Sequence, residues 1–294
     1  MNIKSLSSHK NQEPVSSFLY IVGTPIGNLG DLSQRALNIL KNVSLIACED
    51  TRQTRKILNK YQFSNNLLSF NKHNFINKIP RIIDNLNSGN SVALVSDAGM
   101  PSICDPGEEL VKSAKSRGIN VVCIPGPCAA ITALVTSGMP SSKFIFEGFL
   151  PKKQSERNKI LHNISKSIKT TILFESPHRL KKLLNELKKH FGGDREIQVS
   201  RELTKKYEEQ IGNNINEVID YFQDKEVLGE ITIVIKGRDI ISQQDQEFDE
   251  LELKKELIDL VKAGLTLPQA SKYIAKKNKL SKNLIYNLYK TEIN

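Results

Sequence analysis

Three short segments of this chain carry residue types that bind small ligands, and each comes directly after an apolar run. They are residues 23–30, 96–107 and 125–130. All three are rich in glycine and proline, and the second also contributes the carboxylate of Asp97. In an open α/β sheet, ligands bind beyond the carboxyl ends of the strands. We therefore expect the three segments to be loops around one composite pocket, although ordinary turn formation explains any one of them taken alone.

The glycine spacing of the first segment excludes two familiar phosphate-binding loops. Gly23, Gly27 and Gly30 give the pattern G-x-x-x-G-x-x-G, with Pro25 inside the turn. A dinucleotide fingerprint needs G-x-G-x-x-G and closely spaced backbone N–H groups, and proline removes one of these. No G-K-S/T follows, so a P-loop is excluded as well. What remains is a rigid loop suited to a compact ligand.

The composition is that of a globular chain long enough for two domains. Its 294 residues are 39% hydrophobic and 25% charged, and no apolar run approaches the ~18 residues of a membrane span. Residues 1–17 are polar and lack the apolar core of a signal peptide. The four cysteines show no C-x-x-C spacing, which argues against zinc, iron–sulfur clusters and a disulfide framework. We expect a cytoplasmic protein without a metal site or membrane association.

The formal net charge of +10 is spread unevenly along the chain. Residues 151–210 hold 15 Lys and Arg against 8 Asp and Glu, and residues 250–294 hold 9 Lys against 5 acidic residues. Between them, residues 211–249 hold 3 basic and 9 acidic residues. Such clustering suits an anionic polymer, whereas solvated surface charge is the alternative.

Apolar runs alternate with segments of helical period through the first half of the chain. Strands are expected near 18–22, 44–47, 67–70, 92–95 and 121–124, and helices near 32–42, 51–61, 76–88, 107–117 and 128–137. This alternation predicts a mainly parallel sheet with helices on both faces. We expect Asp31 to cap the first helix and Asp105-Pro106 to begin the fourth.

A second α/β domain and a helical module are expected after residue 140. Strands near 144–149, 171–174, 196–200 and 230–236 alternate with helices near 153–166, 177–191 and 213–224. Three further helical stretches resemble a helix-turn-helix module, which either binds RNA or packs on the body or on a second subunit. The predicted parts are a flexible leader (1–17), two α/β domains (18–140 and 141–237), a linker (238–249) and the helical module (250–294).

Five motifs taken in order resemble one known family. They are Val-Gly-Thr-Pro-Ile-Gly-Asn-Leu-Gly-Asp (22–31), Cys-Glu-Asp-Thr-Arg (48–52), Ser-Asp-Ala-Gly-Met-Pro (96–101) with Asp-Pro-Gly (105–107), Pro-Gly-Pro-Cys-Ala-Ala (125–130) and Glu-Ser-Pro-His-Arg (175–179). Together they resemble the small-subunit ribosomal RNA cytidine 2′-O-methyltransferase I family, of the tetrapyrrole-methylase-like class of S-adenosylmethionine enzymes. The resemblance covers residues 18–236 and extends to the helical tail.

The resemblance implies a fold, a cofactor and partners. It implies two α/β domains of the tetrapyrrole methylase type, with S-adenosylmethionine in the cleft between them, and a homodimer. The implied acceptor is the ribose 2′-hydroxyl of a cytidine in the decoding region of 16S rRNA, so 16S rRNA or the small ribosomal subunit is the expected partner. By position, the residues implied to bind the donor are Pro25, Asp97, Met100, Ala129, Ala130, Phe174 and Thr232.

Methyl transfer to a hydroxyl requires a group that takes its proton. The candidates are Glu49, Asp50, His73 and Glu175, in loops expected to face the cleft. For Glu49 and Asp50 the alternative is a helix start, with Arg52 pairing back onto the acids. For Glu175 it is a helix that begins at Pro177.

Cations near these carboxylates suit an RNA backbone. Arg52, His178 and Arg179 are the expected phosphate contacts, because cationic side chains recognise phosphate well. Two rival functions stay open from sequence. One is a porphyrin-, corrin- or diphthamide-pathway methyltransferase of the same fold, and the other is a non-catalytic RNA-binding protein of ribosome assembly.

Overall fold

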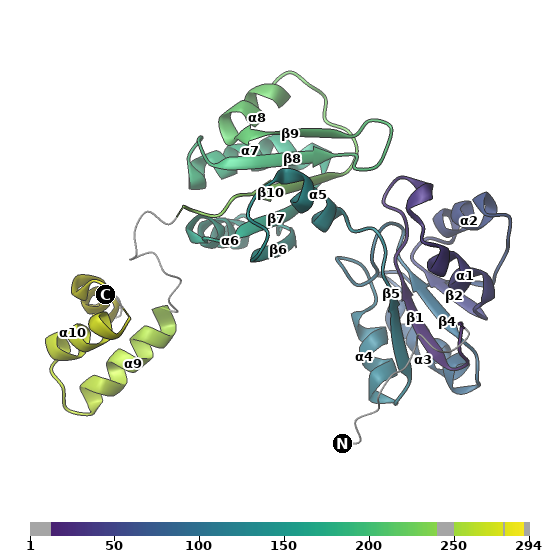
Figure 1. Cartoon of the computed structure of the whole chain (residues 1–294), viewed down its shortest axis with the longest axis horizontal. Coiled ribbons are helices and arrows are strands. Elements are labelled where there is room, and N and C mark those ends of the chain that lie inside the picture. The colour runs from purple at the N-terminus through teal and green to yellow at the C-terminus, as the bar shows by residue number, and fades with distance from the viewer. Residues whose placement is uncertain (1–12, 240–249, 279, 291–294) are drawn as a thin grey trace. The chain divides into compact units, whose positions relative to one another are not determined.

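The computed structural model describes residues 13–239, 250–278 and 280–290, which fall into two compact units. Unit 1 comprises the described parts of Met1–Asn163 and Thr170–Lys236 and contains both β-sheets. Unit 2 comprises Ile164–Lys169 and the described parts of Gly237–Asn294, with the three C-terminal helices (Figure 1). Most of the predicted leader (1–12) and of the predicted linker (240–249) lies outside the described residues.

The first sheet is entirely parallel, which confirms the predicted mainly parallel sheet. Its strands are β1 (Phe18–Val22), β2 (Leu45–Cys48), β3 (Leu67–Ser69), β4 (Val92–Val95) and β5 (Asn120–Ile124), in the order β3-β2-β4-β1-β5. The helices between them are α1 (Gln34–Asn42), α2 (Thr51–Lys60), α3 (Phe75–Asn87) and α4 (Glu108–Ser116), and α5 (Ala129–Ser137) follows β5.

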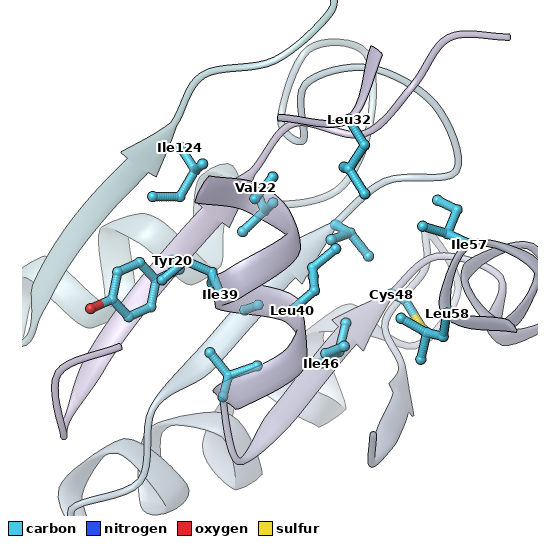
Figure 2. Close-up of a cluster of buried hydrophobic side chains, with 14 of the residues drawn as sticks. Tyr20, Val22, Leu32, Ile39, Leu40, Ile46, Cys48, Ile57, Leu58 and Ile124 are labelled. Carbon is cyan, nitrogen blue, oxygen red and sulfur yellow. The ribbon is translucent and has the colours of Figure 1, made fainter. Parts of the chain in front are cut away.

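Alternation along the strands divides the core of this sheet into two layers. Tyr20 and Val22 pack with α1 and α2 on one face, as Figure 2 shows. Leu19 and Ile21 pack with α3 and α4 on the other face. Both faces of a parallel sheet are covered, which explains why its strands read as continuous apolar runs. Burial of each large aliphatic side chain contributes about 1.5–3 kcal/mol to folding.

The strand order brings the three predicted loops together. β4, β1 and β5 are adjacent and parallel, so the loops after their carboxyl ends leave the same edge of the sheet. Thr24 and Gly99 exchange two backbone hydrogen bonds of 2.9 and 3.1 Å, which join the first two loops. A Cβ on Gly23 would lie 2.7 Å from Cα of Gly126, so glycine is required where the first and third loops meet.

The second sheet is mixed and has one strand that the sequence did not reveal. Its strands are β6 (Phe144–Phe149), β7 (Thr170–Glu175), β8 (Glu196–Arg201), β9 (Glu209–Asn214) and β10 (Ile231–Ile235), in the order β6-β7-β10-β8-β9. Only β6 and β7 are parallel. The helices are α6 (Gln154–Lys166), α7 (Pro177–Phe191) and α8 (Ile215–Phe222). Helix α5 packs against this sheet through Ala130, Ala133 and Leu134.

Two predicted helix starts are wrong. Ser33, not Asp31, caps α1, because its hydroxyl accepts from the Ala36 N–H at 3.0 Å and Asp31 closes a short 3₁₀ turn (Leu29–Asp31). Helix α4 begins at Glu108 rather than at Asp105-Pro106. Residues 105–107 stay in the loop after β4, because Gly107, the residue before the first helical residue Glu108, has a φ of 157° that is not helical.

The first described residues are bonded within unit 1, and the last helices form a core of their own. The end of the predicted leader is held to unit 1, since Arg35 pairs with Glu13 at 2.6 Å and the Val15 N–H donates to the Tyr20 hydroxyl at 2.8 Å. Unit 2 contains α9 (Glu250–Lys262), α10 (Leu267–Lys277) and α11 (Lys282–Lys290) around their own apolar core. No helix among the described residues has the length and apolar character needed to cross a bilayer.

Candidate active site

A cavity of about 390 Å³ lies where the loops of the first sheet meet the strand ends of the second. The loops after β1, β2, β4 and β5 line one side, and residues at the ends of β6, β7 and β10 line the other. We call it the main cavity. Its volume lies in the range typical of sites for small organic ligands. The predicted composite pocket is therefore present, and it uses both sheets.

Five of the seven residues expected to bind the donor line the main cavity. They are Asp97, Met100, Ala129, Phe174 and Thr232. Pro25 and Ala130 are not among the lining residues. Pro25 is buried and its neighbour Ile26 forms the wall, whereas Ala130 is buried in the apolar cluster under α5. Adjacent residues point in different directions along a loop or a helix, so a motif alone cannot say which one faces the ligand.

Three carboxylates give the main cavity an acidic side. Burial raises the pKa of Glu49, and the neighbouring charges of Asp105 and Asp97 raise it further, while Lys72 acts in the opposite direction. Burial also raises the pKa values of Asp97 and Asp105. The Asp50 N–H donates to Oδ1 of Asp97 at 2.9 Å and favours its charged form. The cavity can therefore hold a cationic ligand or accept a proton.

A second hollow, of about 360 Å³, shares Glu49 with the main cavity, and we call it the His73 hollow. It is lined by Glu49, Asp50, Thr51, Arg52, Ser69, Asn71, Lys72 and His73. His73 and Asp50 therefore lie beside the main cavity rather than in it.

Asp50 is the N-cap of helix α2, so this segment forms the helix start that was the alternative to a catalytic role. Its Oδ1 accepts from the Arg52 N–H at 2.8 Å, and its Oδ2 pairs with the Arg52 guanidinium at 2.6 Å. These contacts lower the pKa of Asp50 to about 2. A carboxylate held in this way is a poor proton acceptor near neutral pH. The Arg52 side chain is 84% exposed despite the ion pair.

Glu175 lies in the wall of the main cavity and is fixed by two arginines. Its side chain is fully buried and pairs with Arg157 and Arg179, each at 3.3 Å. Arg157 is itself buried and also pairs with Glu186. Helix α7 begins at Pro177 as expected from the motif. The geometry indicates a bracing role for Glu175 at the junction of β7 and α7.

The other two residues expected to contact phosphate differ in accessibility. His178 is exposed on the first turn of α7. Arg179 is 29% exposed, and its guanidinium donates to the Leu150 carbonyl oxygen at 2.9 Å in addition to the pair with Glu175. The Arg179 guanidinium is therefore mainly engaged in contacts within the protein.

Several residues of the main cavity were not selected from sequence. They include Ile26, Asp105, Cys128, Phe149, Leu203 and Glu230. Asp105 belongs to the Asp-Pro-Gly motif (105–107), and a second carboxylate in the same loop as Asp97 was a signal for it. Leu203 and Glu230 enter from segments that carry no glycine-rich motif, so only the tertiary fold identifies them. No group of three or more His, Cys, Asp or Glu side chains suited to a metal ion occurs in the part of the chain that the structure describes.

Comparison with known proteins links this geometry to methyl transfer. Residues 18–219 match the family model described as Tetrapyrrole (Corrin/Porphyrin) Methylases. The chain is 42% identical over 273 residues to Ribosomal RNA small subunit methyltransferase I of Bacillus subtilis (strain 168), covering 92% of this chain and 93% of that protein. It is 47% identical over 221 residues to the protein of the same name from Thermotoga maritima, covering 75% of this chain and 99% of that protein.

Solved structures share the fold. A cobalt precorrin-4 methyltransferase of cobalamin biosynthesis matches with a TM-score of 0.58 and 16% identity, covering 75% of this chain and 95% of that one. Uroporphyrin-III C-methyltransferase from Thermus thermophilus, complexed with S-adenyl homocysteine, matches with a TM-score of 0.53 and 16% identity, covering 74% and 96%. The low identity shows a common architecture and no more.

Proposed function

Because this chain belongs to the ribosomal RNA small subunit methyltransferase I family of the tetrapyrrole methylases, we propose that it methylates the ribose 2′-hydroxyl of a cytidine in the decoding region of 16S rRNA, with S-adenosylmethionine as donor. The single observation that carries the proposal is the main cavity. Its volume suits a small organic ligand, it lies at the junction of both sheets, and it gathers the motifs of the family.

The main cavity fits S-adenosylmethionine, which supplies an electrophilic methyl group on a sulfonium when bound. Phe149, Phe174 and Met100 offer apolar surface for the nucleoside and the methylene groups of the methionine chain. Asp97, with a charge stabilised by the Asp50 N–H, offers a counter-charge for the cationic groups. Ala129 and Thr232 complete the contact surface, while Pro25 and Ala130 shape the cavity from behind its wall. We assign no metal to this site.

Glu49 is our choice for the group that takes the proton of the acceptor hydroxyl. It lines both the main cavity and the His73 hollow, which supports a position between the proposed donor and acceptor sites. Burial and two neighbouring carboxylates raise its pKa, which makes it a stronger base than an ordinary glutamate. The hydroxyl oxygen gains the methyl group, its proton passes to Glu49, and the donor leaves as the neutral thioether. Asp50 and Glu175 are engaged in ion pairs, and His73 lines the hollow through which we propose that the acceptor enters.

The RNA acceptor would enter from the side of the His73 hollow. Arg52 is the best placed of the three expected phosphate contacts, because it lines this hollow and is largely exposed. His178 is exposed and free to contact a neighbouring nucleotide. Arg179 mainly holds Glu175 in place.

A homodimer fits three exposed apolar side chains of unit 1. Ile131 and Val135 on α5 and Phe144 on β6 are large apolar side chains with exposures of 44%, 71% and 40%. α5 buries its opposite face on the second sheet, so this outer face is available to a second copy. Sedimentation of the wild-type chain and of Val135→Asp would test this: a dimer that the variant dissociates supports the proposal, and a monomeric wild type contradicts it.

The decisive experiment maps ribose methylation in 16S rRNA by mass spectrometry, in cells with and without this gene. Loss of one 2′-O-methylcytidine in the decoding region, restored by the wild-type gene, is the expected result. In vitro, the purified chain should bind S-adenosylmethionine by calorimetry and label 16S rRNA or small subunits. Labelling of porphyrinogens instead would favour the porphyrin or corrin alternative. Absence of donor binding would favour a non-catalytic assembly protein, and a cytoplasmic location is expected in either case.

A further inference from the structure

A third hollow, of about 750 Å³, adjoins the main cavity and has a different character. We call it the Lys60 hollow, and it is lined by Gly27, Asn28, Leu29, Gly30, Lys60, Tyr61, Thr204, Lys205 and Lys206. Ile26 and Leu203 line the main cavity, while the next residue of each chain segment lines this hollow. The partition is fixed by the Asn28 N–H, which donates to the Thr204 hydroxyl oxygen at 3.0 Å.

The Lys60 hollow is basic. It contains three lysines and no acidic lining residue. Lys205 pairs with Glu202 and Glu230 at 2.7 Å each and so holds the loop between β8 and β9. Lys60 and Lys206 are exposed, and within the described ranges neither forms an ion pair. Two ammonium groups are therefore available to an anion.

The backbone around these lysines is preorganised. A Cβ on Gly27 would lie 2.7 Å from the Thr204 hydroxyl oxygen, so the two loops approach as closely as glycine allows. Glu202 and Thr204 have φ angles of 54° and 66°, a conformation that the ion pairs of Lys205 maintain. Among the residues that the structure describes, the N–H groups of Gly27 and Leu29 have no hydrogen-bond acceptor. Unpaired N–H groups beside lysines are typical of anion sites.

We propose that the Lys60 hollow binds a backbone phosphate of the RNA acceptor, close to the nucleotide that is methylated. This inference rests on the proposed function, because it places the backbone of the same RNA whose ribose hydroxyl is proposed to reach Glu49. Lys60 and Lys206 contact the phosphodiester, and Lys205 positions the loop. The contact carries no base specificity and fixes the register of the RNA.

The test compares charge-removing variants with matched controls in the full-length protein. Lys60→Gln with Lys206→Gln removes the two lysines of the hollow that form no ion pair within the described ranges. The control pair is Lys41→Gln with Lys225→Gln: Lys41 lies in the last turn of α1 as Lys60 does in α2, and Lys225 lies over a tyrosine ring as Lys206 does. Binding of 16S rRNA and of small subunits is measured by filter retention over a range of salt, and donor binding by calorimetry.

We expect the Lys60/Lys206 pair to weaken RNA binding about tenfold at low salt. The slope of log K against log salt should become shallower by about 0.7 to 1 for each phosphate that the variant no longer neutralises. Donor affinity and the control pair should match the wild type. The KM for RNA should rise with little change in kcat.

Unchanged RNA affinity and salt slope would overturn the proposal, and so would an equal effect of the control pair. The proposed function fails separately, if the wild type transfers no methyl group to 16S rRNA. In that event, RNA binding that still depends on Lys60 and Lys206 supports the phosphate site, and a wild type that binds no RNA overturns both.

Discussion

The main cavity and the Lys60 hollow are neighbours of opposite charge. Glu49, Asp97 and Asp105 line the first, whereas the second has lysines and no carboxylate in its lining. They are separated by one residue along the chain in two places. Ile26 and Leu203 line the main cavity, and the residues that follow them, Gly27 and Thr204, line the Lys60 hollow. Both belong to unit 1, whose two sheets are shown in Figure 1.

This difference matches the charges of the two proposed substrates. The donor carries a sulfonium, which carboxylates attract, while RNA carries one negative charge for each phosphate. Under the proposed function, we expect carboxylates in the main cavity to repel phosphates, so that the RNA backbone stays outside and only a sugar hydroxyl reaches Glu49. The opposite charges therefore separate donor binding from acceptor binding, and variants in the two regions should have separable effects.

The largest effect is expected from Glu49→Gln. Removal of the base should lower kcat by about 10²–10⁴-fold. Because the reactive form is the carboxylate, wild-type activity should fall as pH drops through the raised pKa of Glu49. Single-turnover methyl transfer measured against pH checks both points.

Glu109→Gln, at an exposed acid of α4, is the matched control. It should retain the wild-type kcat and the same fall in activity at low pH. An unchanged free energy of unfolding would show that the Glu49→Gln variant is folded. If this folded variant kept the wild-type kcat, Glu49 would not be the base.

Arg157→Met should have the next largest effect, on stability. Arg157 is buried and pairs with Glu175 and Glu186, so its removal leaves carboxylates without their main partner. Breaking such a buried pair costs about 3–5 kcal/mol of unfolding free energy. Chemical denaturation measures it. Lys153→Met removes the exposed pair with Glu156 and should cost at most about 1 kcal/mol; equal losses would mean that Glu175 is not braced as the structure indicates.

Asp97→Asn should weaken donor binding without affecting RNA. The substitution removes both the charged acceptor of the Asp50 N–H and the counter-charge for the donor. Hydrogen bonds to charged groups contribute about 1.5–3 kcal/mol, or roughly 10- to 100-fold in Kd. Calorimetry with S-adenosylmethionine and filter binding with RNA give the two values. Equal losses of both affinities would contradict the separation of the two regions.

Much of this arrangement could be predicted from sequence, for a physical reason. Strands buried on both faces are continuous apolar runs, such as Val92–Val95, and the loops after them carry glycine, proline and Asp97. Strand β9 was missed because Glu209–Asn214 is polar and pairs with β8 alone at the edge of its sheet. Edge strands need no apolar pattern, and so they leave little trace in the sequence.

The walls of the site were harder to predict than its position. Asp105 was expected to begin a helix, but the loop with positive φ angles at Ser102 and Cys104 carries it into the main cavity instead. Leu203 and Thr204 contribute to two hollows from a loop far beyond Ile26 and Gly27 in sequence. Such partners depend on how the sheets pack, which local pattern does not encode.

The smallest effect is expected from Asp50→Asn, and it sharpens the assignment of Glu49. Asparagine caps a helix as well as aspartate does, so α2 should keep its start. The ion pair to Arg52 that the substitution removes is exposed, and pairs of that kind contribute about 0–1 kcal/mol. Since the pKa of Asp50 is about 2, this group stays ionised throughout the working pH range.

Asp50→Asn should therefore keep the acid limb of the pH profile at the wild-type position, whereas Glu49→Gln removes it. The two residues are adjacent in sequence and share the His73 hollow, so general damage to that region would affect both variants alike. Loss of the acid limb in Asp50→Asn alone would transfer the role of base to Asp50. Because Arg52 is released from its partner in this variant, a slightly tighter RNA affinity with an unchanged kcat would also place Arg52, rather than the carboxylate, in contact with the acceptor.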